Sequence, residues 1–358
     1  MRNGDGQAGG ADGAAGAPLV SVLLPTCNRA AYLPERIASI ERQTFRDFEV
    51  IVCDSNSTDG SRELLGAWAR RDARARVFQV PRAGIYPAWN ECLRRARGKY
   101  VHWATSDDTM APETLERLLG GLSRHPGCRV ALCGLAVVGD DGRLVPGEAQ
   151  WLNSPWGVFW GRLGFLEREH VRRAPLDMAL AGALHNPWHS SNQLLVERSL
   201  YAELGGYRTD LGPGADFEWN IRAAAVADAV FVPGAMAVLR RHGGSATALN
   251  RTRNTADMDI KIRILSLALE WLRGRDAGLA ARLEAAGWRE PFLLQGAFYH
   301  WRERGWLRGL PALARFLAGG GLSRAGFALC FLANAARGKE AVRGALARRV
   351  ARRAGLPL

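Results

Sequence analysis

Short apolar runs alternate with amphipathic stretches over the first third of the chain. Residues 19–25 (LVSVLLP) and 48–54 (FEVIVCD) are aliphatic and β-branched runs that end at turn residues, which predicts buried strands. Between residues 31 and 42 the apolar positions recur with helical spacing, which predicts a helix. The alternation continues with a strand at 77–80, a helix at 86–96 and a strand at 99–105. This order predicts a parallel sheet covered by helices on both faces.

The pattern is less regular beyond residue 122. It predicts, in chain order, a strand at 129–138, a hairpin turn at 140–142, helices at 197–204 and 217–226, strands at 229–232 and 235–240, and a helix at 257–272. Residues 150–190 carry many Trp, Pro and His residues, which favours loops with short helices, and helical periodicity dominates from residue 291. We therefore expect a disordered lead at 1–17, an α/β domain at 18–255 and a helical, basic region at 256–358.

Charge adds information mainly at the carboxyl-terminal end. The chain of 358 residues has a formal net charge of +13, and residues 291–358 alone hold twelve Lys and Arg residues against two Glu residues. A surplus of this kind predicts an anionic neighbour, such as an acidic membrane surface. The alternative is a solvated helical face. No segment resembles a nucleic-acid-reading module, so we expect no nucleic-acid partner.

Neither the cysteines nor the apolar segments indicate a secreted or membrane-spanning protein. The six cysteines form no CxxC pair and no metal-finger spacing, which favours a reducing, cytoplasmic setting. The most apolar stretch near the end of the chain, residues 310–336, is interrupted by Arg315, Arg324 and three glycines. We expect a cytoplasmic protein that associates peripherally with the inner face of the cell membrane.

Acidic residues follow two of the predicted strands. Asp54 ends one strand, and the pair Asp107-Asp108 follows another. Ligands collect at the carboxyl ends of strands in parallel sheets, and Mg²⁺ is bound by one or two carboxylates together with substrate phosphates. The structural alternative is that the acidic pair caps the helix that follows it.

Six segments in register resemble family 2 glycosyltransferases, which are inverting enzymes with the GT-A fold. The resemblance covers residues 19–255, and its segments are 20–33 (VSVLLPTCNRAAYL), 48–61 (FEVIVCDSNSTDGS), 84–98 (GIYPAWNECLRRARG), 100–112 (YVHWATSDDTMAP), 214–222 (GADFEWNIR) and 240–247 (RRHGGSAT). It implies an α/β fold with a mostly parallel central sheet flanked by helices.

The resemblance also implies which residues bind the donor, a nucleotide diphosphate sugar for which uridine is the favoured base. The implied donor-binding residues are Pro25, Thr26, Asn28, Asp54, Arg82, Asn90, Asp107 and Asp108. The chain departs from the family pattern at Ser55, where a second acidic residue is usual, and at Thr105, where the first acid of the acidic-x-acidic motif is missing. Asp107 is then expected to bind the metal, while Asp108 binds a sugar hydroxyl or orders the loop.

The metal and catalytic residues follow from the same resemblance. His242 is expected to join Asp107 as a ligand to Mg²⁺ or Mn²⁺. Asp216 is expected to be the catalytic base, with Glu218 as the reserve candidate; the family's usual Glu-Asp pair is here Ala215-Asp216. A first-turn helical acid favoured by the helix dipole is the structural alternative for Asp216.

The aromatic residues of the middle segment are candidates for the acceptor site, because aromatic faces stack on sugar rings. We select Trp156, Trp188 and His189. A satellite core beneath long loops is an equal alternative.

The expected function is transfer of a sugar onto an acceptor hydroxyl, in the assembly of bacterial surface polysaccharides or lipid-linked glycans. Two alternatives stay open: a catalytically degenerate protein that binds sugar nucleotides or acts as a membrane scaffold, and a sugar-nucleotide nucleotidyltransferase. The latter normally has a Gly-rich loop after its first strand, which residues 23–29 lack.

Overall fold

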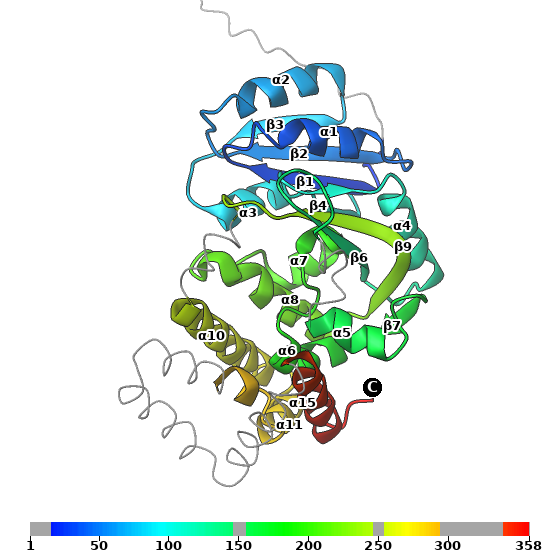
Figure 1. Ribbon diagram of the computed structural model, residues 1–358, viewed down its shortest axis with the longest axis vertical. Coiled ribbons are helices and arrows are strands. Elements are labelled where there is room, and N and C mark those ends of the chain that lie inside the picture. The colour runs from blue at the N-terminus through cyan, green and yellow to red at the C-terminus, as the bar shows by residue number, and fades with distance from the viewer. Residues whose placement is uncertain (1–15, 146–154, 246–253, 294–338, 358) are drawn as a thin grey trace, which may run out of the picture.

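The computed structural model describes residues 16–145, 155–245, 254–293 and 339–357 (Figure 1). The predicted lead at 1–17 and much of the basic region lie outside these described residues. The division of the chain into a lead, an α/β domain and a helical region stays a prediction.

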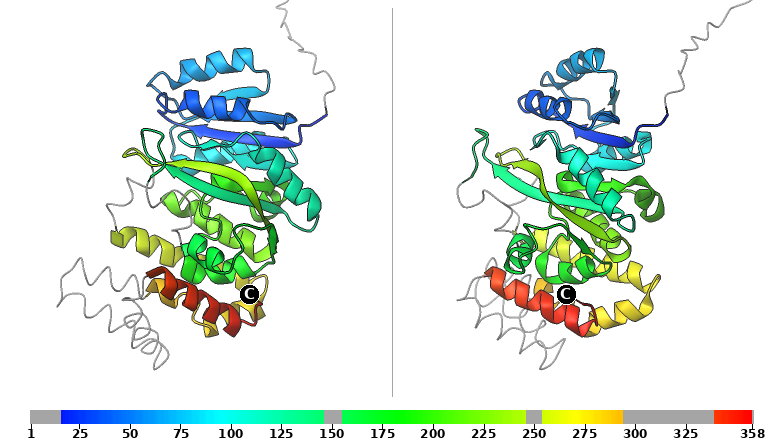
Figure 2. Two further views of the ribbon diagram at one scale, coloured as in Figure 1. Left: turned by 45° about the vertical axis from the view of Figure 1, so that its right-hand side comes forward. Right: turned by 90° about the vertical axis from the view of Figure 1, so that its right-hand side faces the viewer.

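A parallel α/β unit forms the first half of the molecule, as predicted. Its strands pair in the order β3-β2-β1-β4, all parallel. They are β1 (Val20–Thr26), β2 (Phe48–Asp54), β3 (Ala75–Gln79) and β4 (Tyr100–Trp103). The connecting helices are α1 (Leu33–Glu41), α2 (Ser61–Arg71) and α3 (Ile85–Arg95). Helices α1 and α2 contact each other, whereas α3 packs on β1 and β2 from the other face (Figures 1 and 2).

The second half extends the same sheet with mixed strand directions. β8 (Leu194–Glu197) is antiparallel to both β4 and β6 (Val130–Val138), and β6 is parallel to β9 (Ala229–Arg240). The short strands β5 (Thr109–Met110) and β7 (His170–Arg172) pair with β9. None of the three strands β5, β7 and β8 is predicted from the sequence, because two to four residues are too few to show a period.

One strand replaces the two strands predicted at 229–232 and 235–240. β9 runs through Pro233 and Gly234, and its register against β6 shifts between Cys133 and Gly134. Gly234 has a φ of +79°, a conformation that glycine adopts without steric cost. The Pro-Gly pair therefore marks a bulge inside β9 and not a break between strands.

A layer of helices lies below the sheet (Figures 1 and 2). Its members are α5 (Pro155–Arg162), α6 (Leu176–Leu184), α8 (Ala215–Val226), α10 (Asn254–Arg273), α11 (Ala277–Ala285) and α15 (Lys339–Arg353). Two further helices contact the sheet itself, α4 (Thr114–Arg124) on β6 and β9 and α7 (Arg198–Leu204) on β8. All nine residues of α6 are buried, because α8 and α15 both pack against it. Helix α10 packs on α8, so the helices at 254–285 share one hydrophobic core with the sheet.

None of the described helices is long and apolar enough to cross a membrane.

Candidate active site

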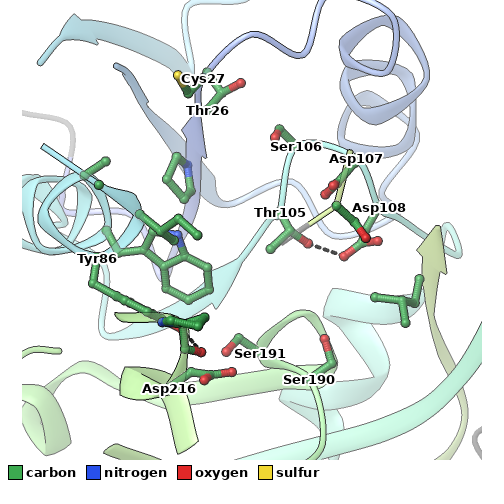
Figure 3. A pocket seen from close by; sticks show the side chains of 18 of the residues that line it. Thr26, Cys27, Tyr86, Thr105, Ser106, Asp107, Asp108, Ser190, Ser191 and Asp216 are labelled. Atoms are coloured by element: carbon green, nitrogen blue, oxygen red, sulfur yellow. Dashed lines mark hydrogen bonds between the residues drawn. The ribbon is translucent and has the colours of Figure 1, made fainter. Parts of the chain in front are cut away.

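A cavity of about 1110 Å³ opens at the carboxyl ends of β1 and β4. The order β3-β2-β1-β4 places these two strands side by side. Helix α1, which connects β1 to β2, and helix α3, which connects β3 to β4, lie on opposite faces of the sheet. Ligands bind at such a switch point because neighbouring loops diverge there and leave a crevice. Figure 3 shows residues of the β1 end, the loop after β4 and the start of α8 around one space.

Asp107 and His242 meet in this cavity, although 135 residues separate them along the chain. The His242 Nε2 atom lies 2.9 Å from the Asp107 carboxylate, in an ion pair if the imidazole is protonated. Asp107 is in the loop after β4, and His242 follows the end of β9, the strand that pairs with the segment after that loop. The Arg29 Nε atom lies 3.8 Å from the same carboxylate. The structure thus brings the two predicted metal ligands together.

The donor atoms of Asp107 and His242 fit a divalent cation that shares its coordination with a substrate. A carboxylate oxygen and a neutral imidazole nitrogen are ligands that Mn²⁺ accepts. The described residues hold no cluster of three or more His, Cys, Asp or Glu side chains suited to a metal. In phosphate-binding sites Mg²⁺ is usually held by one or two protein ligands, and phosphate oxygens and water fill the remaining coordination positions.

Asp108 orders the loop that carries Asp107. Its side chain is buried and accepts hydrogen bonds from the Thr105 hydroxyl, from Asn192 Nδ2 at 3.0 Å and from the backbone N–H of Arg240 at 2.8 Å. Burial, and next the charge of Asp107, raises the pKa of Asp108 to about 7. The loop-ordering role therefore accounts for Asp108 better than a sugar contact.

Arg240 ties the loop after β4 to the loop that carries His242. Its buried guanidinium donates to the carbonyl oxygens of Asp107 at 3.3 Å, Gly139 at 3.2 Å and Asp140 at 3.1 Å, and it pairs with Glu35 of α1. These bonds fix the end of β9 two residues before His242. The basic residue of the Arg-x-His pattern thus serves to place the histidine.

Asp216 lies in the first turn of α8 and faces the cavity (Figure 3). Its Oδ1 atom accepts from the backbone N–H of Phe217 at 2.8 Å. Burial raises the pKa of Asp216, while the Phe217 N–H, the hydroxyl of Tyr86 and the charge of Lys261 act in the opposite direction. A half-buried carboxylate with a raised pKa at a cavity wall has the properties of a general base.

Glu218 does not lie at the cavity, which corrects its selection as the reserve base. Its side chain is buried and both carboxylate oxygens accept from Arg222, Oε1 at 2.7 Å and Oε2 at 2.9 Å. Because residues two apart on a helix point in different directions, Asp216 and Glu218 cannot share a site.

A family model described as "Glycosyl transferase family 2" matches residues 21–176, the segment that holds β1 to β6 and Asp107. These residues belong to glycosyl transferase family 2.

Two individual proteins are similar to this chain. The uncharacterized protein MT1568 of Mycobacterium tuberculosis is 28% identical over 238 residues, which cover 66% of this chain and 71% of that protein. The putative teichuronic acid biosynthesis glycosyltransferase TuaG of Bacillus subtilis is 32% identical over 126 residues, or 35% of this chain and 50% of TuaG. The chain thus spans only half the length of TuaG.

The crystal structure of S. aureus TarS 1-349 in complex with UDP-GlcNAc has the same fold. It matches with a TM-score of 0.59 at 18% identity, over 94% of this chain and 92% of that chain. This likeness confirms the predicted GT-A fold with a helical region after the sheet.

Three of the predicted donor-binding residues border the cavity at the β1 and β2 ends. Pro25 and Thr26 end β1, and the exposed Arg82 reaches over from the segment after β3. The Arg82 guanidinium donates to the carbonyl oxygens of Ser55, at 3.4 Å, and Asn56, at 3.1 Å. Arg82, a predicted donor-binding residue, therefore lies at this end of the cavity.

Asn28, Asp54 and Asn90 serve structural hydrogen bonds, and none of them lines the cavity. The fully buried Asp54 carboxylate accepts from the hydroxyl and the N–H of Ser57, which closes the turn after β2. Asn90 exchanges two 2.8 Å bonds with the backbone of Tyr207. The predicted direct contacts of these three residues with the donor are therefore not supported by their positions.

Of the predicted acceptor residues, one lines the cavity, one is buried away from it, and one has a side chain outside the described residues. His189 lines the cavity. Trp188 is buried away from it, and its indole N–H donates to Asp177 at 2.9 Å, so it belongs to the satellite core. Trp156 lies in α5, and its side chain is outside the described residues.

Several cavity residues are not selected from the sequence. They are Arg29, Tyr86, Asn186, Ser190, Ser191 and Lys261. Common residue types of this kind carry no motif, and their exposure to the cavity depends on the loop after α6 and on the packing of α10. A left-handed backbone at His185 and His189 is likewise unreadable from the sequence.

Proposed function

We propose that this protein transfers a sugar from a nucleotide diphosphate to an acceptor hydroxyl, with inversion at the anomeric carbon. The single observation that carries the proposal is that Asp107 and His242 border the same cavity as Asp216. Family 2 membership supports a glycosyl transfer. The UDP-GlcNAc bound to TarS favours a UDP-sugar donor, and the name of TuaG favours an acceptor in polysaccharide assembly.

The donor nucleotide would lie against the ends of β1 and β2. Pro25, Thr26 and Ser55 border that part of the cavity. Arg29 and Arg82 line the route toward Asp107, and guanidinium groups match the geometry of phosphate oxygens. The diphosphate would therefore be held between the two arginines and the loop after β4.

A divalent cation, Mg²⁺ or Mn²⁺, would be held by Asp107 and His242. When bound, it would supply positive charge beside the leaving diphosphate. The buried bonds of Asp108 and Arg240 hold both ligands in place before any substrate binds. Such preorganisation lowers the cost of assembling the site during the reaction.

Asp216 would act as the general base. Its carboxylate accepts the proton of the acceptor hydroxyl while the acceptor oxygen forms a bond to the anomeric carbon. The bond from that carbon to the diphosphate oxygen breaks at the opposite face, and the nucleoside diphosphate leaves with the bonding electrons. The start of a helix suits this role, because the helix dipole stabilises the carboxylate before it takes the proton.

Release of nucleoside diphosphate tests the proposal. Purified protein would be incubated with UDP-glucose, UDP-galactose, UDP-GlcNAc and GDP-mannose, with Mn²⁺ or with EDTA. We expect slow release of nucleoside diphosphate from one donor in the presence of Mn²⁺ and none in EDTA. A protein whose melting temperature rises with a donor but which releases no product would be a binding protein, and the proposed activity would be wrong.

We also propose peripheral association with an anionic membrane surface on the cytoplasmic side. Two observations support this proposal. Residues 291–358 hold twelve basic and two acidic residues, and Arg352 and Arg353 are exposed on α15. Because α15 packs on α6, replacing these arginines by Glu is a cleaner test than truncation. Sedimentation with phosphatidylglycerol vesicles should fall in the double variant; equal sedimentation would reject the idea.

A further inference from the structure

The loop that follows α6 has an unfavourable backbone conformation at the cavity wall. His185 has φ 71° and ψ −149°, a region that is almost confined to glycine, and His189 has φ 51°. Both residues line the cavity. A non-glycine residue in such a conformation is strained and persists where the surrounding structure imposes it, often at a binding site.

Hydrogen bonds on both sides hold this loop in place. Asn186 Oδ1 accepts from Asn220 of α8 at 2.8 Å, on the helix that carries Asp216. At the other end, Asn192 donates to Asp108 at 3.0 Å, and Gln193 donates to the carbonyl oxygen of Cys133 at 2.6 Å. The loop therefore spans the distance between the proposed base and the proposed metal loop.

Ser191 has an unpartnered hydroxyl within this wall. The residue is 4% exposed and lines the cavity, and its Oγ atom has no hydrogen-bond partner among the described residues. A buried hydroxyl without a partner destabilises the folded protein. In Figure 3 Ser191 lies beside Asp216, on the side of the pocket opposite Asp107, and Ser190 lies between Asp216 and Asp108.

We propose that residues 185–191 form the acceptor subsite, in which the Ser191 hydroxyl bonds to a hydroxyl of a neutral sugar. This inference rests on the proposed function. The wall contributes amide, hydroxyl and imidazole groups but no carboxylate, which suits recognition of sugar hydroxyls. It adjoins Asp216, whereas the nucleotide end of the cavity lies at Pro25, Ser55 and Arg82. A sugar bound here presents its reacting hydroxyl to the base.

The test is the variant Ser191→Ala in the full chain. Wild type and variant would be assayed for nucleoside diphosphate release from the preferred donor, alone and with p-nitrophenyl hexosides as acceptors. We expect the KM for the acceptor to rise about 5- to 10-fold, as for one lost hydrogen bond. The donor KM and the acceptor-free hydrolysis should stay near the wild-type values.

Ser21→Ala is the matched control. Ser21 is equally buried but has two partners, Glu49 and the N–H of Gly98, both at 2.8 Å and outside the cavity. The control should melt at a lower temperature with unchanged KM values. Ser191→Ala should melt at or above the wild-type temperature, because it removes a hydroxyl that has no partner in the free protein.

Three results would overturn the inference: an unchanged acceptor KM, a higher donor KM with an unchanged acceptor KM, or a melting temperature lowered as in Ser21→Ala. The second result would assign the hydroxyl to the donor sugar. Failure of the proposed function is distinguishable, because wild-type protein would then release no nucleoside diphosphate from any donor.

Discussion

The two halves of the sheet form the two ends of the cavity in different ways. At the proposed nucleotide end, the parallel strands β1 and β2 place Pro25, Thr26 and Ser55 at the cavity, at or directly after the ends of buried strands. At the opposite end, the wall consists of the loop after α6, the first turn of α8 and part of α10. Its side chains depend on helix packing and on bonds such as Asn186 to Asn220.

This difference separates a general site from a specific one. Under the proposed function, the strand ends offer backbone groups that many nucleotides could use, whereas the helical wall offers individual side chains that would discriminate between acceptors. We call the wall formed by the loop after α6, the first turn of α8 and part of α10 the helical end. Substitutions of its cavity-lining side chains should change the rate of transfer and the KM for the acceptor. Substitutions that only disturb packing there should lower stability and leave the affinity for the donor unchanged.

The largest effect is expected from Asp216→Asn at the helical end. The amide cannot take the acceptor proton, so kcat for transfer should fall by about 10²–10⁴-fold. Donor affinity, measured by calorimetric titration with the nucleoside diphosphate, should stay near the wild-type value. Turnover that survives the substitution would remove Asp216 from its role.

Asp107→Asn tests the proposed metal site, which lies between the two ends of the cavity. The amide is a weaker cation ligand, so turnover in Mn²⁺ should fall by about 10²-fold or more, and EDTA should abolish wild-type turnover. Asp141→Asn is the control, because Asp141 lies in an exposed turn and its side chain contacts Arg143. Turnover that is indifferent to EDTA would refute the metal proposal.

Glu218→Gln should separate packing from chemistry on the same helix as Asp216. The substitution leaves the buried Arg222 guanidinium without its anionic partner, which should lower the free energy of unfolding by about 3–5 kcal/mol. Urea denaturation measures this loss. The folded fraction should keep the wild-type kcat; a loss of kcat comparable with that of Asp216→Asn would return Glu218 to the site.

The smallest effect is expected from Tyr86→Phe. The Tyr86 hydroxyl donates to the carbonyl oxygen of Pro213 at 3.2 Å, and its proximity lowers the pKa of Asp216 against the effect of burial. Without the Tyr86 hydroxyl the pKa of Asp216 should rise, so a larger share of the Asp216 carboxylate is protonated at low pH. The acid limb of the kcat/KM profile should move up by about 1 pH unit or less, with little change at high pH.

Tyr201→Phe is the control for this profile. The Tyr201 hydroxyl bonds to Trp103 at 2.8 Å and to Tyr207 at 3.1 Å, and burial raises the pKa of Tyr201. Tyr201 belongs to the same aromatic cluster that contacts Tyr86. The Tyr201→Phe substitution should leave the acid limb in place. The charge of Lys261 also lowers the pKa of Asp216, and Lys261 is retained in each variant. Tyr207, whose own pKa is raised by burial and by the charge of Asp216, is retained as well. Equal shifts in the two variants would mean that the effect is structural.

The sequence predicts the parallel half nearly completely, because buried strands are continuous apolar runs with clear ends. The bounds of β2 agree residue for residue, and the pairing of Asp107 with His242 follows from the family motifs. The helical end is less predictable. Helix α8 is buried on most of its circumference, so its sequence has little amphipathic contrast to show that Glu218 points inward.

The other differences between the predicted and the observed cavity residues depend on which hydrogen-bond partners each side chain has in the folded protein. Asp54 and Asn90 have the residue types and positions of ligand contacts, yet Asp54 is satisfied by Ser57 in the turn that follows it, and Asn90 by the backbone of Tyr207, which only the folded chain brings near. Ser191 is the reverse case. A serine in a loop is unremarkable in a sequence, and its relevance comes from lacking a partner where a partner is expected.

The packing of α15 on α6 has a consequence for biosynthesis. Helix α6 is entirely buried, and part of its cover is supplied by residues 339–353, more than 150 positions further along the chain. The parallel strands can pair as soon as they leave the ribosome, but the apolar surface of α6 stays open until α15 emerges. The helical layer must therefore close late, and during that interval the nascent chain exposes a surface that chaperones recognise.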